Sequence, residues 1–281
     1  MKHRIHSSRV LLTGASSGIG NALARLLAAK GADIVVTARR EKLLDELIAG
    51  VHRDNPEYGN GSRKIVSIAG DICDSEVRKR CITVAQEQLG GVDILINNAG
   101  VGATALAMET PDEIFRRMME VNYFSLIQMT QAAFPLLQES ASNKERQNDG
   151  ICPIVINIGS IVGLRGVPHY SAYGASKFAV TCFSDVLRAE FAAKKIDVLH
   201  VSPGTTQTEF FDSLLMSGSV PDFPIHPKVT AEYVAKKIIR AIERGKHRII
   251  PYIPAVVLAL IQRFSPRLTD TIMERYVQKH Q

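Results

Sequence analysis

The chain has 281 residues, 46% of them hydrophobic, which is enough to bury a sizeable core. Its net charge of +6 comes from scattered residues, and it has no tryptophan, so nothing indicates a nucleic-acid partner. No run reaches the roughly 18 apolar residues that cross a bilayer, and the basic N-terminus is not followed by the apolar region of a signal peptide, so we expect a cytoplasmic protein. The four cysteines form no Cys-x-x-Cys pair, which indicates reduced thiols and no metal site.

Short apolar runs alternate with helical patterns along the chain. Seven runs are expected to be strands: Arg9–Thr13, Asp33–Thr37, Lys64–Ala69, Val92–Asn97, Pro153–Gly159, Asp197–Ser202 and His247–Pro251. Helical patterns lie between them: Gly18–Lys30, Glu41–Arg53, Asp74–Leu89, Pro111–Leu137, Ser171–Lys195 and Ala231–Arg244. Strands that are apolar throughout, such as Ile154–Ile156, are typical of a sheet covered on both faces. The repeated strand–helix–strand units therefore predict a single α/β domain, residues 1–281, with a doubly wound parallel sheet of about seven strands.

Three local features refine this prediction. Thr110, Pro111 and Glu113 have the pattern of a capping box with proline at the first helical position, which predicts a helix start there. Two polar stretches, 54–63 and 139–150, are expected to be surface loops, the second of them mobile. The proline-containing stretch at about 205–228 follows a strand's carboxyl end and is predicted to form a lid over a site.

The C-terminal extension, about 252–281, contains a run that is apolar on all sides, Ile253–Ile261, followed by Arg263, Arg267 and Arg275. It is too short to span a bilayer, and three fates remain open: core or pocket wall, subunit interface, or contact with a membrane surface. We predict that residues 254–264 pack on the protein near the lid, because a helix that is apolar all round is normally buried.

Gly14, Gly18 and Gly20 lie between the first strand and the first helix. Glycine permits a tight turn and a close approach of backbone to a pyrophosphate, whose charge the helix N-terminus favours. The spacing Gly-x-x-x-Gly-x-Gly differs from the general dinucleotide fingerprint, and a purely structural turn is the alternative.

Tyr173 and Lys177 are four residues apart, so on a helix they share one face and can point into the same cleft. A nearby cation favours the charged form of a phenol, whose ordinary pKa is about 10. Lys177 together with a positively charged cofactor ring is therefore expected to lower the pKa of Tyr173, so that it exchanges a proton with an alcohol or ketone near neutral pH.

The glycine loop, Asn97-Asn98-Ala99-Gly100 and the Tyr-x-x-x-Lys pair occur in order, and with them the chain closely resembles the short-chain dehydrogenase/reductase family. The resemblance extends from about Arg9 to Thr208. It implies a Rossmann-like sheet with helices on both faces, a nicotinamide cofactor and reversible oxidoreduction between an alcohol and a ketone.

The resemblance also implies roles for individual residues. Tyr173 is similar to the general acid/base, and Lys177 to its electrostatic partner and a ligand of the nicotinamide ribose. Ser160 resembles the serine that hydrogen-bonds the reacting oxygen, and Asn122 the asparagine that holds a relay water. Taken alone, Ser160 also fits an ordinary strand-end serine and Asn122 a structural asparagine.

The same resemblance implies a set of cofactor contacts. The loop would hold the pyrophosphate, Asp71 and Ile72 the adenine, and Asn98 the ribose of the adenosine. The segment after the sixth strand would cover the nicotinamide, with Thr206 in place of the usual aliphatic residue. The cofactor-binding residues so implied are Gly14, Ser16, Ser17, Gly18, Ile19, Gly20, Arg39, Asp71, Ile72, Asn98, Tyr173, Lys177, Pro203, Gly204, Thr206 and Thr208.

The end of the second strand indicates which cofactor is used. Ala38 stands where NAD-preferring members carry an aspartate, and Arg39 follows it. An arginine suits a 2′-phosphate in charge and geometry, and Ser17 adds a hydrogen-bond donor, so we expect NADP. The alternative is that Arg39 and Arg40 are solvated charges at a helix start.

The sequence thus predicts an NADP-dependent oxidoreductase acting on a small-molecule alcohol or ketone. The apolar content of 101–108, 161–169 and the lid, which includes Met108 and Phe211, favours a hydrophobic substrate. The long helices 111–137 and 171–195 resemble those through which relatives associate and carry apolar residues on several faces, which predicts a homodimer or homotetramer. The alternatives are a sensor that binds NADP(H) without turnover and a reductase of lipid ketones at a membrane surface.

Overall fold

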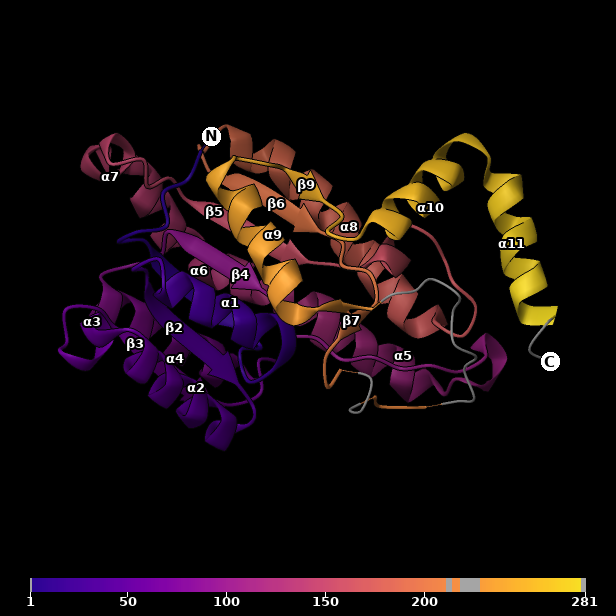
Figure 1. The fold of residues 1–281 in the computed structure, drawn as a ribbon, viewed down its shortest axis with the longest axis horizontal. Helices are drawn as coiled ribbons and strands as arrows, with labels where there is room; N and C mark the ends of the chain where they lie inside the picture. The colour runs from indigo at the N-terminus through magenta and orange to yellow at the C-terminus, as the bar shows by residue number, and fades with distance from the viewer. Residues whose placement is uncertain (1, 211–213, 218–227, 279–281) are drawn as a thin grey trace.

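The structure is a computed structural model that describes residues 2–210, 214–217 and 228–278. A seven-stranded parallel sheet runs through its centre in the order β3-β2-β1-β4-β5-β6-β9 (Figure 1). Its strands are β1 (Arg9–Thr13), β2 (Asp33–Ala38), β3 (Ile65–Ala69), β4 (Ile94–Asn97), β5 (Ile154–Ile158), β6 (Asp197–Val201) and β9 (Arg248–Ile249). A separate parallel pair is formed by β7 (Thr206–Gln207) and β8 (Val229–Thr230). The seven predicted strands and their parallel arrangement are confirmed.

Helices connect the strands and cover both faces of the sheet (Figure 1). They are α1 (Gly18–Ala28), α2 (Glu41–Asp54), α3 (Pro56–Gly59), α4 (Ser75–Val84), α5 (Asp112–Met119), α6 (Ser125–Ser142), α7 (Lys144–Asn148), α8 (Ser171–Ala192), α9 (Ala231–Glu243), α10 (Ile253–Phe264) and α11 (Pro266–Gln278). Short π-helices, η1 (Ala85–Leu89) and η3 (Glu120–Phe124), follow α4 and α5, and 3-10 turns form at η2 (Ala107–Glu109) and η4 (Ile161–Gly163).

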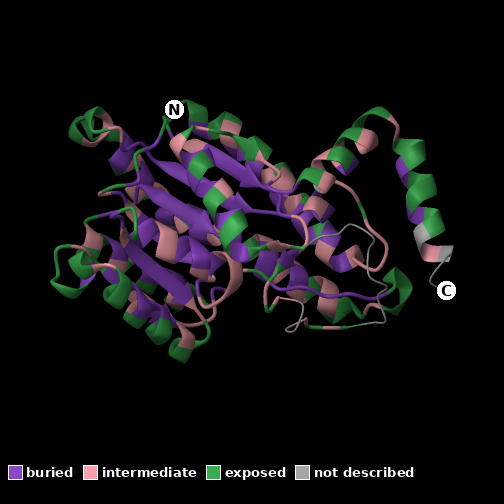
Figure 2. Ribbon diagram, in the orientation of Figure 1, coloured by how far each residue is buried: buried purple, intermediate pink, exposed green. Residues whose placement is uncertain are grey.

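Alternate residues of each strand enter two different cores. Leu12 and Val36 face α1, α2 and α9, whereas Leu11 and Val35 face α4, α6 and α8. All four are completely buried, and Figure 2 shows the strands buried between outer helices whose far sides are exposed. Because both faces are covered, strands that are apolar throughout are stable here, as the sequence indicated.

The topology fixes where a site can form. The chain passes from β1 to β2 on one side, while β4 pairs with β1 on the other side. The loops that follow β1 and β4 therefore diverge at the carboxyl ends of these strands. In doubly wound sheets this divergence opens a crevice for ligands.

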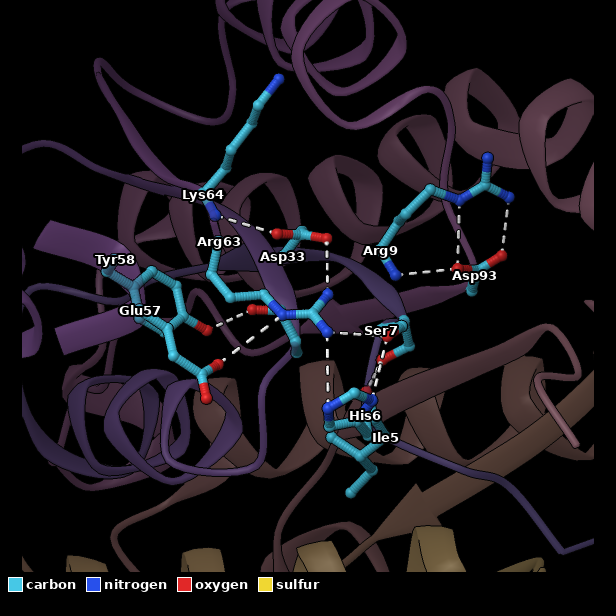
Figure 3. Close-up of polar contacts among 12 residues, drawn as sticks. Ile5, His6, Ser7, Arg9, Asp33, Glu57, Tyr58, Arg63, Lys64 and Asp93 are labelled. Atoms are coloured by element: carbon cyan, nitrogen blue, oxygen red, sulfur yellow. Dashed lines mark hydrogen bonds and ion pairs between the residues drawn. The ribbon is translucent and has the colours of Figure 1, made fainter. Parts of the chain in front are cut away.

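Ion pairs fasten the opposite end, where the strands begin (Figure 3). Arg9 at the start of β1 donates to the buried carboxylate of Asp93, next to β4, at 2.7 and 3.1 Å. Asp33 at the start of β2 accepts from the Lys64 amide at 2.9 Å and from Arg63 at 3.4 Å. These contacts serve the pairing of strands rather than the crevice.

Two local predictions are wrong. Helix α5 starts at Asp112, and the Thr110 hydroxyl does not cap it but donates to the Leu106 carbonyl at 2.9 Å. The stretches expected to be loops contain α3, the end of α6 and α7. The helix expected to end at Leu137 continues to Ser142 through η3, with Pro135 inside it.

The C-terminal helices α10 and α11 project beyond the body of the molecule (Figure 1). Leu258 of α10 is buried, as the prediction of packing near the lid requires, but Ile253 and Phe264 are 74% and 79% exposed. The expectation that this helix is buried all round is therefore wrong. None of the described helices has the length and apolar content needed to cross a membrane.

Candidate active site

The glycine loop is folded against the end of β4. The Asn98 amide donates to the carbonyls of Thr13 and Gly14 at 3.1 and 2.9 Å. Gly14 has a φ of +72°, and a Cβ there would lie 2.7 Å from the Ala99 Cα, so only glycine fits. Gly20 is packed behind the loop, where a Cβ would collide with the Gly14 carbonyl. The loop thus presents its backbone and the N-terminus of α1 to the crevice, an arrangement suited to a phosphate.

Helix α8 brings Tyr173 and Lys177 to the same crevice. The Lys177 ammonium is buried, donates to the Ile158 carbonyl at 2.9 Å and lies 5.8 Å from the centre of the Tyr173 ring. The phenol ring packs against Phe210 at 5.5 Å and Tyr170 at 6.5 Å between centroids. The predicted pair therefore does share one face and one cavity.

Burial dominates the ionisation of this pair. It raises the pKa of Tyr173 to about 12, although hydrogen bonding with Ser160 opposes the rise. It also lowers the pKa of Lys177 to about 8. In the protein alone the phenol pKa is thus raised and not lowered, since desolvation outweighs any effect of an ammonium 5.8 Å from the ring.

Ser160 follows β5 and begins the η4 turn, whose tight packing on α8 fixes its place beside Tyr173. The Val162 amide donates weakly to the Ser160 hydroxyl at 3.4 Å. A Cβ on Gly163 would lie 2.7 Å from the carbonyl carbon of Lys177, which shows how closely η4 approaches the helix. Ser160 is 8% exposed, and its open surface faces the cavity.

Asn122 lies in the π-helix η3, behind the cavity wall. Its amide accepts from the Val101 N–H at 2.8 Å and donates to the Val101 carbonyl at 3.0 Å and the Ser176 hydroxyl at 2.9 Å. A Cβ on Gly100 would lie 3.1 Å from the Asn122 carbonyl oxygen and 3.6 Å from the Lys177 nitrogen, so these two side chains meet at Gly100. A π-helical turn of this kind is frequent at functional sites.

The end of β2 carries a basic cluster that sequence reasoning identified only in part. Arg39 is exposed, lines the cavity and has no hydrogen bond or ion pair with the described residues. Arg40 instead donates to the hydroxyls of Ser17 at 2.6 Å and Ser16 at 3.1 Å, and pairs with Glu209 at 2.7 Å. Its adjacency to Arg39 was the only signal in the sequence, because Ser16, Ser17 and Glu209 are remote along the chain.

Asp71 and Ile72 line the cavity at the end of β3, but the Asp71 carboxylate is engaged by the protein. It accepts from the Cys73 N–H at 2.9 Å and from Arg117 of α5 at 2.8 Å. Burial alone would raise the pKa of Asp71, but these two partners outweigh it and lower the pKa. Arg117, which the sequence did not single out, is a second cation in the cavity wall.

The segment after β6 covers the other side of the cavity. Thr206 is buried, and its hydroxyl donates to the Gly204 carbonyl at 3.0 Å instead of turning to the cavity. Thr208 lies against Gly18, so the two cofactor-loop predictions are neighbours. The lid continues through Leu214, which packs on Gly102, while Phe211 lies outside the described residues.

These elements enclose one cavity of about 360 Å³. Every predicted site residue lines it except Gly20 and Asn122, which support its wall. Met108, expected in a substrate wall, is wrong there because it is 94% exposed. Lining residues that the sequence did not identify are Arg40, Arg117, Tyr170, Tyr252 and Leu258.

Comparison with known proteins agrees with this geometry. The family model for short chain dehydrogenases matches residues 8–216. The chain belongs to the short chain dehydrogenase family. A family of this kind makes the chain an oxidoreductase on a Rossmann-like fold, as the resemblance implied.

Individual relatives cover nearly the whole chain. Dehydrogenase/reductase SDR family member 7B from Bos taurus is 30% identical over 99% of this chain and 84% of its own length. A short chain dehydrogenase from Burkholderia cenocepacia, solved with NADP, is 25% identical over 88% of this chain and 97% of its own, with a TM-score of 0.72. A Burkholderia phymatum member solved with NAD is 18% identical over 94% and 96%, with a TM-score of 0.80, and shows the fold alone.

Proposed function

We propose that the protein is an NADP(H)-dependent oxidoreductase that interconverts a hydrophobic secondary alcohol and its ketone. The observation that carries this proposal is the meeting of Tyr173, Ser160 and Lys177 in one wall of a cavity whose other end is formed by the glycine loop. The loop, the α1 N-terminus and the serine–arginine cluster fit a dinucleotide phosphate in charge and geometry.

The cofactor, when bound, supplies or accepts the hydride. Tyr173 has a pKa of about 12, so its phenol is protonated at neutral pH and is able to donate a proton to a ketone oxygen. Ser160 beside it offers the same oxygen a hydrogen bond. Lys177, charged below a pKa of about 8, then stabilises the phenolate that remains after the donation. The residues are therefore poised for ketone reduction.

Support for NADP over NAD comes from the end of β2. Ala38 offers no carboxylate for a ribose hydroxyl, and two arginines with two serines surround this end of the cavity. We expect Arg39→Ala and Arg40→Ala each to weaken NADPH binding about 10-fold or more and to change NADH binding little, since charge-assisted bonds to a phosphate are lost. Fluorescence titration of both cofactors measures this, and an equal loss for both would contradict the assignment.

The proposed activity is tested by a screen of ketones and aldehydes with NADPH, followed through the absorbance of the reduced cofactor. Turnover of an apolar ketone that needs NADPH is the expected result. A protein that binds NADPH tightly but turns over no substrate, and in which Tyr173→Phe changes nothing, would be the sensor considered above. The cytoplasmic location expected from the sequence stays a prediction.

A further inference from the structure

Helix α10 has two sides with different surroundings. Ile253, Val257, Leu260 and Phe264 are 74, 50, 50 and 79% exposed. Their spacing of four, three and four residues places them in one narrow stripe, because each residue turns about 100° around a helix. Leu258, on another side, is buried and lines the cavity. One side of the helix is thus part of the site, while the other offers apolar side chains to the outside.

Helix α11 repeats this arrangement. Leu268 and Ile272, four residues apart, are 50% and 38% exposed, whereas Thr269 and Met273 on its other side are buried. Figure 2 shows exposed outer surfaces on both helices. We name the exposed apolar positions of the two helices the apolar stripe: Ile253, Val257, Leu260, Phe264, Leu268 and Ile272.

The charges around the apolar stripe are mostly positive. Arg263 and Arg267 flank the junction of the helices, and Arg275 lies three residues after Ile272, on the same side of α11. All three are exposed, and none pairs with an acidic group among the described residues.

The acidic groups of α11 lie elsewhere. Asp270 faces the body of the protein, where it pairs with Arg165 at 2.5 Å. Glu274 is six residues from Leu268, about 120° away around the helix. Cations therefore border the apolar side chains, and carboxylates avoid them.

We propose that the apolar stripe docks on an anionic phospholipid surface. Apolar side chains bordered by arginines are typical of helices that lie in the headgroup region, and no described helix is long enough to span the bilayer. A second copy of the chain fits less well, because a two-fold contact through this face would bring Arg263, Arg267 and Arg275 toward their own copies. Anionic lipid satisfies both the apolar and the basic groups.

Docking in this way has a consequence for the site, which rests on the proposed function. Leu258 and Tyr252 line the cavity, and Val257 and Leu260, the neighbours of Leu258 along α10, would face the bilayer. The cavity would then lie next to the membrane surface. Its substrate class would be an apolar ketone or alcohol that partitions into lipid.

Sedimentation of the full chain with vesicles tests the docking without requiring turnover. We expect binding to phosphatidylcholine vesicles that contain phosphatidylglycerol, little binding to pure phosphatidylcholine, and a loss of binding as salt increases. The double variant Val257→Glu with Phe264→Glu should bind at least about 10-fold more weakly, since two carboxylates would enter the interface. Met108→Glu, a change at an equally exposed apolar residue elsewhere, should bind as the unsubstituted protein does.

Three results would overturn the proposal. The first is an unsubstituted protein that does not bind the anionic vesicles. The second is a double variant that binds them equally well. The third is light scattering that shows the double variant dissociating a dimer, because a second copy would then cover the stripe. If vesicles bind but no ketone is ever reduced, the docking stands and only the proposed function, with its substrate class, fails.

Discussion

At the scale of single residues, the protonation of Tyr173 decides what the site does. The phenol is held neutral by burial, with a pKa of about 12, and the nearby Lys177 has a pKa of about 8. A neutral phenol is an acid in waiting, whereas a phenolate would be a base. The protein alone therefore prepares proton donation to a ketone rather than proton removal from an alcohol.

Replacing Tyr173 tests this role directly. Tyr173→Phe removes one oxygen and should lower kcat by about 100- to 10,000-fold, because general acid catalysis contributes that much. The dissociation constant for NADPH should stay unchanged, since the ring remains packed on Phe210. Tyr170→Phe is the matched control, because its ring lies 6.5 Å away in the same cavity and its kcat should be almost normal. A Tyr173→Phe enzyme with a tenth of the normal rate would rule out the assignment.

How far the site was predictable depends on the distance of its contacts along the chain. Tyr173 and Lys177 are four residues apart, so their shared face follows from helical spacing alone. Arg40 lies 169 residues from Glu209, and no local pattern indicates that pair. The phenol pKa was predicted in the wrong direction for the protein alone, because the sequence shows the neighbouring charge but not the depth of burial.

At the scale of elements, the lid is tied to the basic cluster through Glu209 and Arg40. Their ion pair, at 2.7 Å, puts a carboxylate where a 2′-phosphate would be attracted. We expect Glu209→Gln to tighten NADPH binding by about 1.5- to 5-fold, the range for a pair whose side chains are both about half exposed. NADH binding should not change. Glu76→Gln, at an exposed pair far along the chain, is the control, and weaker NADPH binding by Glu209→Gln would contradict the competition.

The start of β4 depends on one carboxylate. Asp93 has no exposed surface in its side chain and accepts hydrogen bonds from Arg9, from Ser140 at 2.6 Å and from Arg146. Asp93→Asn would leave two partly buried guanidinium groups without their counter-charge and should cost about 3–5 kcal/mol of the free energy of unfolding. Urea unfolding measures this loss. Asp112→Asn, at a pair about three-quarters exposed, should cost less than about 1 kcal/mol, and similar losses in both variants would refute the argument.

The same group gives a pH dependence. Burial would raise the pKa of Asp93, but hydrogen bonds and charge from Arg9, Ser140 and Arg146 hold it below its ordinary value of 3.8. The folded state therefore binds fewer protons than the unfolded state near and below that pH. The stability that Asp93 contributes should be complete above pH 3.8 and lost as the pH falls through its folded pKa. In Asp93→Asn, the unfolding free energy should fall less steeply over this range.

The same physics explains which elements were predictable. Strands such as β5 are apolar throughout because both faces are covered, so their positions could be inferred from composition alone. Helix α10 is also apolar at nearly every position, and there the pattern could not show which side faces the cavity. Thr110 has the residue type of a cap, but its hydroxyl meets the Leu106 carbonyl first. Local patterns thus identify elements more securely than they identify their outer contacts.

At the scale of the whole molecule, the two sets of exposed apolar side chains lie on different helices. One is the apolar stripe of α10 and α11. The other lies on η3 and α8, where Phe124, Phe178 and Val186 are 44, 44 and 47% exposed. Phe178, Cys182 and Val186 follow one another at four-residue spacing, so they form a single row along α8. This second surface bears no relation to the cavity, which makes it the better candidate for subunit contact.

We therefore expect a homodimer or homotetramer that associates through α8 and the helix containing η3. Pairing two such rows would bury apolar surface that is otherwise in water, and a two-fold axis would place each row against its own copy. Light scattering at micromolar concentration should give a multiple of the 30.8 kDa chain mass. Phe178→Glu with Val186→Glu should reduce the mass to that of one chain, because four carboxylates would be buried at each two-fold contact. Val257→Glu with Phe264→Glu should leave the oligomer intact, and a monomeric unsubstituted protein would disprove the association.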